Sequence, residues 1–146
     1  MAESLDFTVD KFTFTIPTDR LYHPDGLWIQ PQDGRLVVGL SDYRQQRDGD
    51  IAFVELVPPG TIVARGQPLG TVETIKVDYE LPAPLAGTVV EVNERLELEA
   101  ELINQEPYGA GWLVVLEPEN WLVEKDDLLP AGIYRDLARA QAEEEL

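Results

Sequence analysis

The chain of 146 residues contains no cysteine, so it has no disulfide, no thiolate metal site and no cysteine nucleophile. Its single histidine, His23, cannot form a histidine cluster around a metal ion. The only serines are Ser4 and Ser41, and nothing in their spacing favours a Ser/His/Asp triad. We therefore expect no catalytic residue and no metal site. If the protein takes part in redox or transfer chemistry, we expect the reactive group to come from outside its own side chains.

Basic residues are also scarce. Lys and Arg number 11 against 28 Asp and Glu, which gives a net charge of −17. Because phosphate binding needs a basic surface, this balance argues against a nucleic acid partner. No hydrophobic run reaches transmembrane length, and the N-terminus lacks the basic start and apolar middle of a signal peptide. We expect one cytoplasmic domain with no membrane partner.

Strand-like segments broken by turns make up most of the chain. The stretch 12–16 (FTFTI) alternates apolar and polar residues, as a half-buried strand does. Residues 27–40 predict two strands joined at Asp33 and Gly34, a pair of residues typical of tight hairpins. Further strands are expected near 51–57 and 111–118. The sequence therefore predicts a mainly β fold.

Two helices are expected beside these strands. Ser41 is a good N-cap and Gly49 a good stop, so a short helix is predicted near 41–48. From Asp126 onward the pattern becomes helical, and a C-terminal helix is predicted near 130–144. The apolar face of that helix is expected to contain Ile133, Tyr134, Leu137 and Ala138.

Lys76 is one of only three lysines, with Lys11 and Lys125, and it lies in the stretch GTVETIKVDYELPAPLAGTVVEV at 70–92. A surface lysine is usually just solvated. Here, however, strand-like sequence flanks it on both sides, which places Lys76 at the tip of a hairpin. A long amine on a rigid tip suits the attachment of a covalent cofactor. Glu73, three residues earlier, adds negative charge that a modifying enzyme can recognise.

These residues resemble the H-protein of the glycine cleavage system, within the biotinyl/lipoyl carrier group. ETIK at 73–76 matches the family's Glu-Ser-Val-Lys, with Lys76 at the lipoylated position. PAPLAGTVVEVNERL is similar to its Pro-Val-Ser-Gly stretch and the strand that follows it. NQEPYGAGWLVVLEP is similar to its Asn-x-x-Pro-Tyr-Gly-x-Gly-Trp segment. The resemblance covers roughly 16–146.

The resemblance implies a barrel-sandwich hybrid, the biotinyl/lipoyl hammerhead, over residues 16–146, preceded by an N-terminal extension at 1–15. It implies lipoate in amide linkage to Lys76, whose dithiolane would be the redox centre of a protein without cysteine. The protein would be a carrier and not an enzyme. Biotin is the competing cofactor, but biotin carriers usually have Met on both sides of the lysine, where this chain has Ile75 and Val77.

The chain departs from the family near the arm. Leu27 stands where H-proteins have the Glu of His-Glu-Trp, and a leucine cannot accept a hydrogen bond from an amine. VDYELP follows Lys76 in place of small residues and Ser-Asp-Leu-Tyr. Such a pattern resembles the lipoate-binding proteins of bacterial sulfur oxidation. We therefore expect a sulfur species as cargo, with an aminomethyl-carrying glycine cleavage H-protein as the alternative.

The expected partners follow from the resemblance: a lipoate-attaching enzyme, dihydrolipoamide dehydrogenase, and either a heterodisulfide-reductase-like complex or glycine decarboxylase and aminomethyltransferase. Two other classes stay open, an unmodified binding protein and an enzyme that uses some of the 28 acidic residues. Tyr108 and Trp112 are interpreted as core and turn residues, and His23 as a surface or hydrogen-bonded residue. For Trp28, core packing and a place beside the lipoyl hairpin are equally good interpretations.

Overall fold

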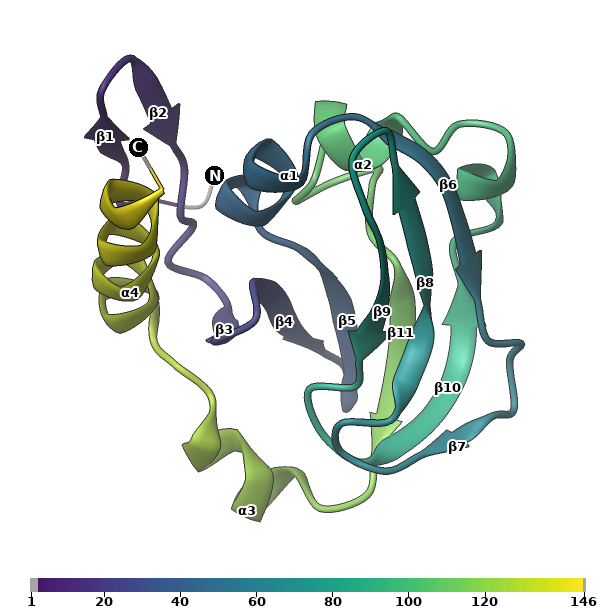
Figure 1. Cartoon of the computed structure of the whole chain (residues 1–146). Coiled ribbons are helices and arrows are strands. Elements are labelled where there is room, and N and C mark those ends of the chain that lie inside the picture. Colours follow the sequence, from purple (N-terminus) through teal and green to yellow (C-terminus); the bar gives the residue numbers. More distant parts are fainter. Residues whose placement is uncertain (1–2, 146) are drawn as a thin grey trace.

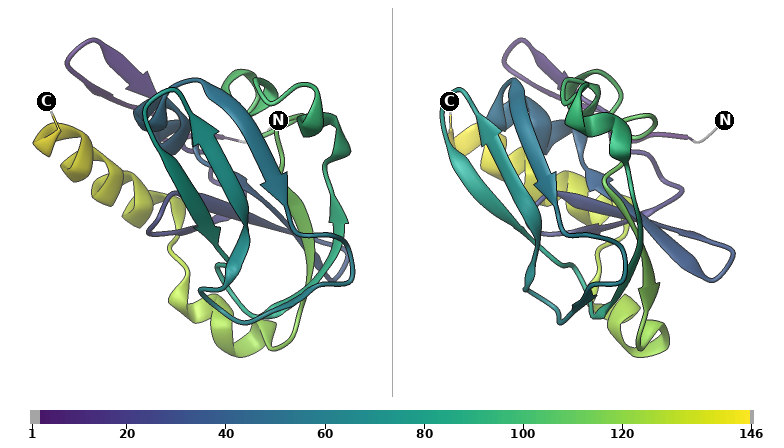
Figure 2. Two further views of the ribbon diagram at one scale, coloured as in Figure 1. Left: turned by 45° about the vertical axis from the view of Figure 1, so that its right-hand side comes forward. Right: turned by 90° about the vertical axis from the view of Figure 1, so that its right-hand side faces the viewer.

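The computed structural model describes residues 3–145, and most of its strands belong to two antiparallel sheets that face each other (Figures 1 and 2). One sheet has the order β6-β8-β9, formed by β6 (Ile51–Leu56), β8 (Pro68–Thr74) and β9 (Asp78–Pro82). The other has the order β3-β4-β5-β11-β10-β7, formed by β3 (Leu21–His23), β4 (Leu27–Gln32), β5 (Arg35–Leu40), β7 (Ile62–Val63), β10 (Gly87–Val92) and β11 (Val114–Pro118). The expected mainly β, barrel-sandwich architecture is confirmed.

The predicted hairpin at 27–40 is present as β4 and β5. Its register places Gln32 opposite Arg35, so that Asp33 and Gly34 form a two-residue turn. Both turn residues have positive φ, 50° and 80°, which the right-handed twist of the flanking strands requires. This short turn fixes which side of β4 faces the core.

The main core lies between the two sheets. Side chains of alternate residues on each strand point into it, including Leu27 and Ile29 of β4 and Val72 of β8, all fully buried. Gly70 of β8 lies so close to β6 that a Cβ there would be 2.2 Å from the carbonyl oxygen of Glu55. This close approach keeps β8 paired with β6, and so supports the β8–β9 hairpin within its sheet.

The expected short helix is α1 (Asp42–Asp48), and Ser41 caps it by accepting a hydrogen bond from the Arg44 amide at 3.1 Å. The C-terminal helix is α4 (Ala131–Glu144). Tyr134 and Ala138 are buried on it as expected, but Ile133 is 56% exposed, so its place on the apolar face was wrong. The buried face continues instead to Ala142. The described residues also form four shorter helices: η1 (Glu94–Glu97), α2 (Leu102–Gln105), α3 (Trp121–Glu124) and η2 (Lys125–Asp127).

A second buried cluster joins the N-terminal segment to α1 and α4. The segment forms a small hairpin of β1 (Phe7–Val9) and β2 (Phe12–Phe14), which lies beside α4 (Figure 1). Phe14 packs edge-on against Tyr43 of α1, with ring centroids 5.4 Å apart. On the other side, Tyr22 stacks flat on Tyr134 at 4.7 Å. The described part of the N-terminal segment, residues 3–15, therefore packs on the body through an aromatic contact, and the status of residues 1–15 as a separate extension stays a prediction.

Candidate functional site

Lys76 lies at the tip of the hairpin formed by β8 and β9, as the sequence predicts. The last paired residues of the two strands are Glu73 and Asp78, and the chain reverses between them. The amide of Thr74 donates to the carbonyl oxygen of Val77 at 2.9 Å, which closes the turn around Lys76. The lysine is therefore held at the far end of a paired strand.

Thr74 organises this turn, and the sequence analysis did not identify it. Its hydroxyl accepts hydrogen bonds from the amides of Lys76 at 3.1 Å and Val77 at 3.0 Å. It also lies 3.0 Å from the carbonyl oxygen of Val77, to which it donates. A threonine at the start of a turn commonly bonds to the backbone two or three residues later, and that is the signal that sequence inspection can use.

The tip is unusually apolar for an exposed turn. Ile75 is 80% exposed and Val77 is 50% exposed, and both flank the exposed Lys76. β-branched side chains stiffen the backbone locally, and exposed apolar residues beside a modifiable amine suit contact with a partner surface. None of the ion pairs among residues 3–145 includes Lys76, so its ammonium group is accessible for acylation.

Glu73 is exposed on β8, where it faces Asp78 across the hairpin. Two carboxylates directly opposite each other repel, and here they make the base of the tip acidic. Recognition of Glu73 by a modifying enzyme stays a prediction.

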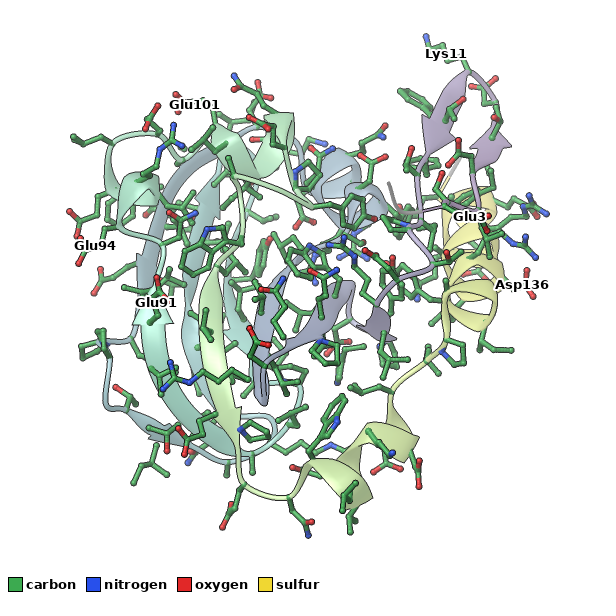
Figure 3. All side chains as sticks on the ribbon, turned by 180° about the vertical axis from the view of Figure 1, so that it is seen from behind. Glu3, Lys11, Glu91, Glu94, Glu101 and Asp136 are labelled. Atoms are coloured by element: carbon green, nitrogen blue, oxygen red, sulfur yellow. The ribbon has the colours of Figure 1, made fainter. Side chains whose placement is uncertain are left out.

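The other two lysines occupy different surroundings. Lys11 is in the turn between β1 and β2, and Figure 3 shows it at the outer end of that hairpin. Its ammonium group lies 5.9 Å from the centroid of the Phe12 ring. Lys125 begins the short helix η2. The turn at Lys11 has no equivalent of the Thr74 hydrogen bonds among those that the structure gives for the described residues.

A buried ionic cluster fixes the β8–β9 hairpin to α1. Arg44 and Asp48, one helical turn apart, are only 8% and 6% exposed, and they form an ion pair at 2.8 Å. The Arg44 guanidinium lies 4.4 Å from the centroid of the Tyr79 ring, and the Tyr79 hydroxyl donates to Asp48. Burial, together with that hydrogen bond, raises the pKa of Tyr79 above its ordinary value. Tyr79 belongs to VDYELP, so this departure from the family pattern has a structural role.

Leu27 is fully buried in the main core between the sheets. Packing in the hydrophobic core therefore explains why a leucine occupies this position. Next to it, Gly26 has φ of 93°, and a Cβ there would be 2.8 Å from the Cβ of Arg44. The residues that replace the family's His-Glu therefore accommodate the buried arginine and the core.

The aromatic residues singled out in the sequence are structural. Trp28 is 1% exposed, and its indole donates to the carbonyl oxygen of Pro107 at 2.9 Å. The Tyr108 hydroxyl donates to Thr15 and accepts from the amide of Asp42. Trp112 is partly buried beside this cluster. Packing in this cluster accounts for Trp28, and packing against it accounts for the partly buried Tyr108 and Trp112.

His23 is half-buried, and its Nδ1 accepts a hydrogen bond from the amide of Asp25 at 3.1 Å. Desolvation by burial lowers the pKa of His23. Within residues 3–145, no three His, Asp or Glu side chains are placed to hold a metal ion. No helix in that part of the chain is long and apolar enough to cross a membrane.

Comparison with known proteins identifies the family. The model of the glycine cleavage H-protein family matches residues 20–141. The glycine cleavage system H protein of Thermus thermophilus is 40% identical over 127 residues, which cover 87% of this chain and 98% of that protein. The protein of the same name from Geobacillus thermodenitrificans is 40% identical over 118 residues, covering 81% and 92%.

A solved structure is similar as well. The crystal structure of a glycine cleavage system H protein from Mycobacterium marinum superposes with a TM-score of 0.73 at 36% identity, covering 83% of this chain and 97% of that one. These relatives favour the glycine cleavage alternative over the sulfur-oxidation expectation, and they do not support a heterodisulfide-reductase-like partner. Glycine cleavage H-proteins carry lipoate covalently on a lysine. The chain belongs to the glycine cleavage H-protein family, whose members are lipoate carriers and not enzymes.

Proposed function

We propose that Lys76 is the lipoyl attachment site and that this chain carries the aminomethyl group of a glycine cleavage system. The observation that supports this most directly is the β8–β9 tip, where Lys76 projects from a turn held by Thr74 and is flanked by exposed Ile75 and Val77. A rigid turn presents the amine to a modifying enzyme in one geometry, which lowers the entropy cost of that encounter.

The residues at the tip fit the cofactor. Lipoate forms an amide with a primary amine, and Lys76 offers one that is outside every ion pair of the described residues. When attached, lipoate supplies a dithiolane for redox and group-transfer chemistry. The buried contact of Arg44 with Tyr79 keeps the hairpin fixed to α1 while the side chain of Lys76 remains free to move.

The proposal implies a defined set of partners. A lipoate-attaching enzyme would act first, and it would recognise Glu73, which precedes Lys76 by three residues and pairs with Asp78 at the base of the tip. Glycine decarboxylase, aminomethyltransferase and dihydrolipoamide dehydrogenase would then meet the modified tip in turn. Each must bind a surface with exposed Ile75 and Val77 on an acidic protein. Since all these encounters use one tip, they must be sequential.

The first test is the intact mass of the protein from its native source, followed by peptide mapping. We expect a lipoyl increment on Lys76 and none on Lys11 or Lys125. Lys76→Arg should abolish the increment, and Lys11→Arg, also in a hairpin turn, should retain it. An unmodified Lys76 in cells whose other lipoyl proteins are modified would overturn the proposal.

The second test addresses the cargo. The lipoylated protein is supplied to glycine decarboxylase, and exchange of labelled CO2 into glycine is measured. Exchange at a rate comparable to that of an H-protein control is expected. Failure of a fully lipoylated protein to support exchange would refute the glycine cleavage role and return the sulfur species as the candidate cargo.

A further inference from the structure

The outer face of the six-stranded sheet, which points away from the β6-β8-β9 sheet that carries Lys76, is hollowed. Side chains alternate between the two faces of a strand, and Val38 and Val114 of this sheet point into the main core. The register therefore turns the residues beside them outward and places four such residues in one row across the sheet: Gln30, Val37, Val115 and Glu91. The first hollow, of about 360 Å³, has all four in its lining.

Trp112 lines this first hollow and also a second one beside it. The second hollow, of about 380 Å³, is lined in addition by Glu91, Glu94 and Pro59. Trp112 is only partly buried, although it packs against the aromatic cluster that contains Trp28. The part of its indole that this packing leaves uncovered therefore faces the two hollows.

Hydrogen bonds hold the backbone of Trp112 in a fixed turn. The side-chain amide of Asn93, which is only 5% exposed, donates to the carbonyl oxygens of Ala110 and Trp112, both at 2.8 Å. The Trp112 amide in turn donates to the carbonyl oxygen of Gly109 at 3.1 Å. The indole is thus already in position in the free protein, so that a contact with it carries little ordering cost.

The neighbouring aromatic rings already have a cation, whereas Trp112 does not. The Arg20 guanidinium lies 4.6 Å from the centroid of the Trp28 ring and 5.2 Å from that of Tyr108. Within residues 3–145, no lysine or arginine lies over the Trp112 ring. The face of this indole is therefore available to a cation from another molecule.

The carboxylates beside Trp112 are not neutralised either. Glu91 and Glu94 are exposed, and Figure 3 shows both on the same side of the molecule. Neither takes part in an ion pair with another described residue. Arg95 also lines the second hollow, but it is paired with Glu99 at 3.1 Å. An open indole beside two unpaired carboxylates suits a guanidinium, which stacks on aromatic rings and donates to carboxylates.

We infer that Trp112, Glu91 and Glu94 form a slot for an arginine side chain of a partner protein, and that an apolar side chain next to that arginine packs on Val37 and Val115. Trp and Arg are the residues that dominate binding energy at protein interfaces. A second copy of this chain is a poor occupant, because two molecules of net charge −17 repel each other.

The partner is one of the enzymes that act on Lys76 or on its lipoyl arm, a choice that rests on the proposed function, whereas the slot itself does not. The slot is on the sheet opposite the β8–β9 hairpin. An enzyme anchored there leaves the lysine tip free to enter its active site.

The first test adds short peptides to the unmodified protein and follows the indole N–H resonances by NMR. Acetylated, amidated Val-Arg-Val should shift the resonance of Trp112 and leave that of Trp121, on α3, unmoved. The peptide Val-Gln-Val, which has no charge, should bind at least about threefold more weakly. Equal affinities for the two peptides, or an unmoved Trp112 resonance, would overturn the slot. A Trp112 shift that grows with protein concentration alone, in a protein that sediments as a dimer, would overturn it in favour of a second copy.

Matched charge variants locate the binding. The double variant Glu91→Gln, Glu94→Gln should bind Val-Arg-Val about three- to tenfold more weakly, because two exposed ion pairs are lost. The control is Glu119→Gln, Asp126→Asn, which changes the net charge equally at two exposed positions outside both hollows. It should bind as the unaltered protein does. Equal losses in the two double variants would mean that only net charge matters, and would overturn the slot.

The same variants test the partner. KM and kcat are measured with the lipoate-attaching enzyme on the unmodified protein, and with glycine decarboxylase, aminomethyltransferase and dihydrolipoamide dehydrogenase on the lipoylated one. For at least one enzyme, Glu91→Gln, Glu94→Gln should raise KM about threefold or more with kcat unchanged, and the control variant should not. Unchanged KM values for all four enzymes would overturn this choice of partner. Absence of the lipoyl adduct would overturn the proposed function alone, because the peptide test uses the unmodified protein.

Discussion

The hydroxyl of Tyr134 on α4 lies 2.8 Å from the hydroxyl of Ser41, which caps α1, although the two residues are 93 positions apart. Both side chains are buried, at 1% and 0% exposure. Burial raises the pKa of Tyr134 to about 12, so its hydroxyl is protonated at neutral pH and able to donate. This buried hydrogen bond therefore links the C-terminal helix to the N-cap of α1, the helix on which the β8–β9 hairpin packs.

Ser41→Ala should lower the free energy of unfolding by about 2–4 kcal/mol. The change removes the N-cap bond to the Arg44 amide, which is worth about 1 kcal/mol. It also leaves the Tyr134 hydroxyl buried without its partner, at a cost of about 1–3 kcal/mol. Urea denaturation measures the difference.

Ser4→Ala is the matched control, since Ser4 is the only other serine and is exposed, where it donates to Asp6. It should change stability by less than about 0.5 kcal/mol. If Ser41→Ala and Ser4→Ala had the same free energy of unfolding, the hydrogen bond between Ser41 and Tyr134 would contribute nothing to stability.

The Arg44–Asp48 pair should behave as a strongly coupled unit. Asp48→Leu alone should cost about 3 kcal/mol or more, because it leaves the buried Arg44 charge without its partner. Arg44→Met should cost less, because Arg47 still lies 3.5 Å from Asp48. The double variant should cost much less than the sum, since neither charge remains. Denaturation of the four proteins in a double-mutant cycle yields the coupling energy.

Arg95 and Glu99 form the control for that cycle. They are also four residues apart and lie 3.1 Å from each other, but their side chains are 60% and 44% exposed. Their coupling energy should be below about 0.5 kcal/mol. Equal coupling in the two cycles would contradict the argument that burial makes the difference.

Sequence patterns predicted the elements whose signals are local. Asp33 and Gly34 specify a two-residue turn whatever surrounds it, and Ser41 with Gly49 bounds α1. Lys76 was placed at a hairpin tip because strand-like residues surround it, and the family resemblance supplied the lipoyl expectation. These predictions needed no knowledge of distant contacts.

Features that depend on distant contacts were missed. Ile133 has the right spacing for the apolar face of α4, but the neighbours that bury Tyr134 and Ala142 do not extend over it. Nothing local distinguishes Arg44 as a buried residue. Asp48 lies on the same helix, but Tyr79 contacts the pair only when the β8–β9 hairpin packs on α1.

Thr74→Val should slow lipoylation of Lys76 by about tenfold. Valine keeps the shape and β-branching of threonine but removes the hydroxyl that bonds to the amides of Lys76 and Val77. Each lost bond is worth about 1 kcal/mol, so the turn loses its single geometry. The initial rate is measured by intact mass with purified lipoate-attaching enzyme. Thr71→Val, exposed on the same strand but away from the turn, should modify at the normal rate, and a similar loss there would point to the strand and not the turn.

The stability of the protein should depend on pH through His23. Burial lowers its pKa in the folded state, whereas the unfolded chain has the ordinary value of 6.5. The unfolded state therefore binds the proton more tightly, and the free energy of unfolding falls as pH drops through 6.5 and below. His23→Asn keeps an acceptor for the Asp25 amide but cannot titrate. Urea denaturation from pH 8 to pH 5 should show a smaller loss of stability in His23→Asn than in the unaltered protein, because other groups titrate equally in both. Parallel curves for the two proteins would mean that His23 is protonated as easily in the folded state as in the unfolded one.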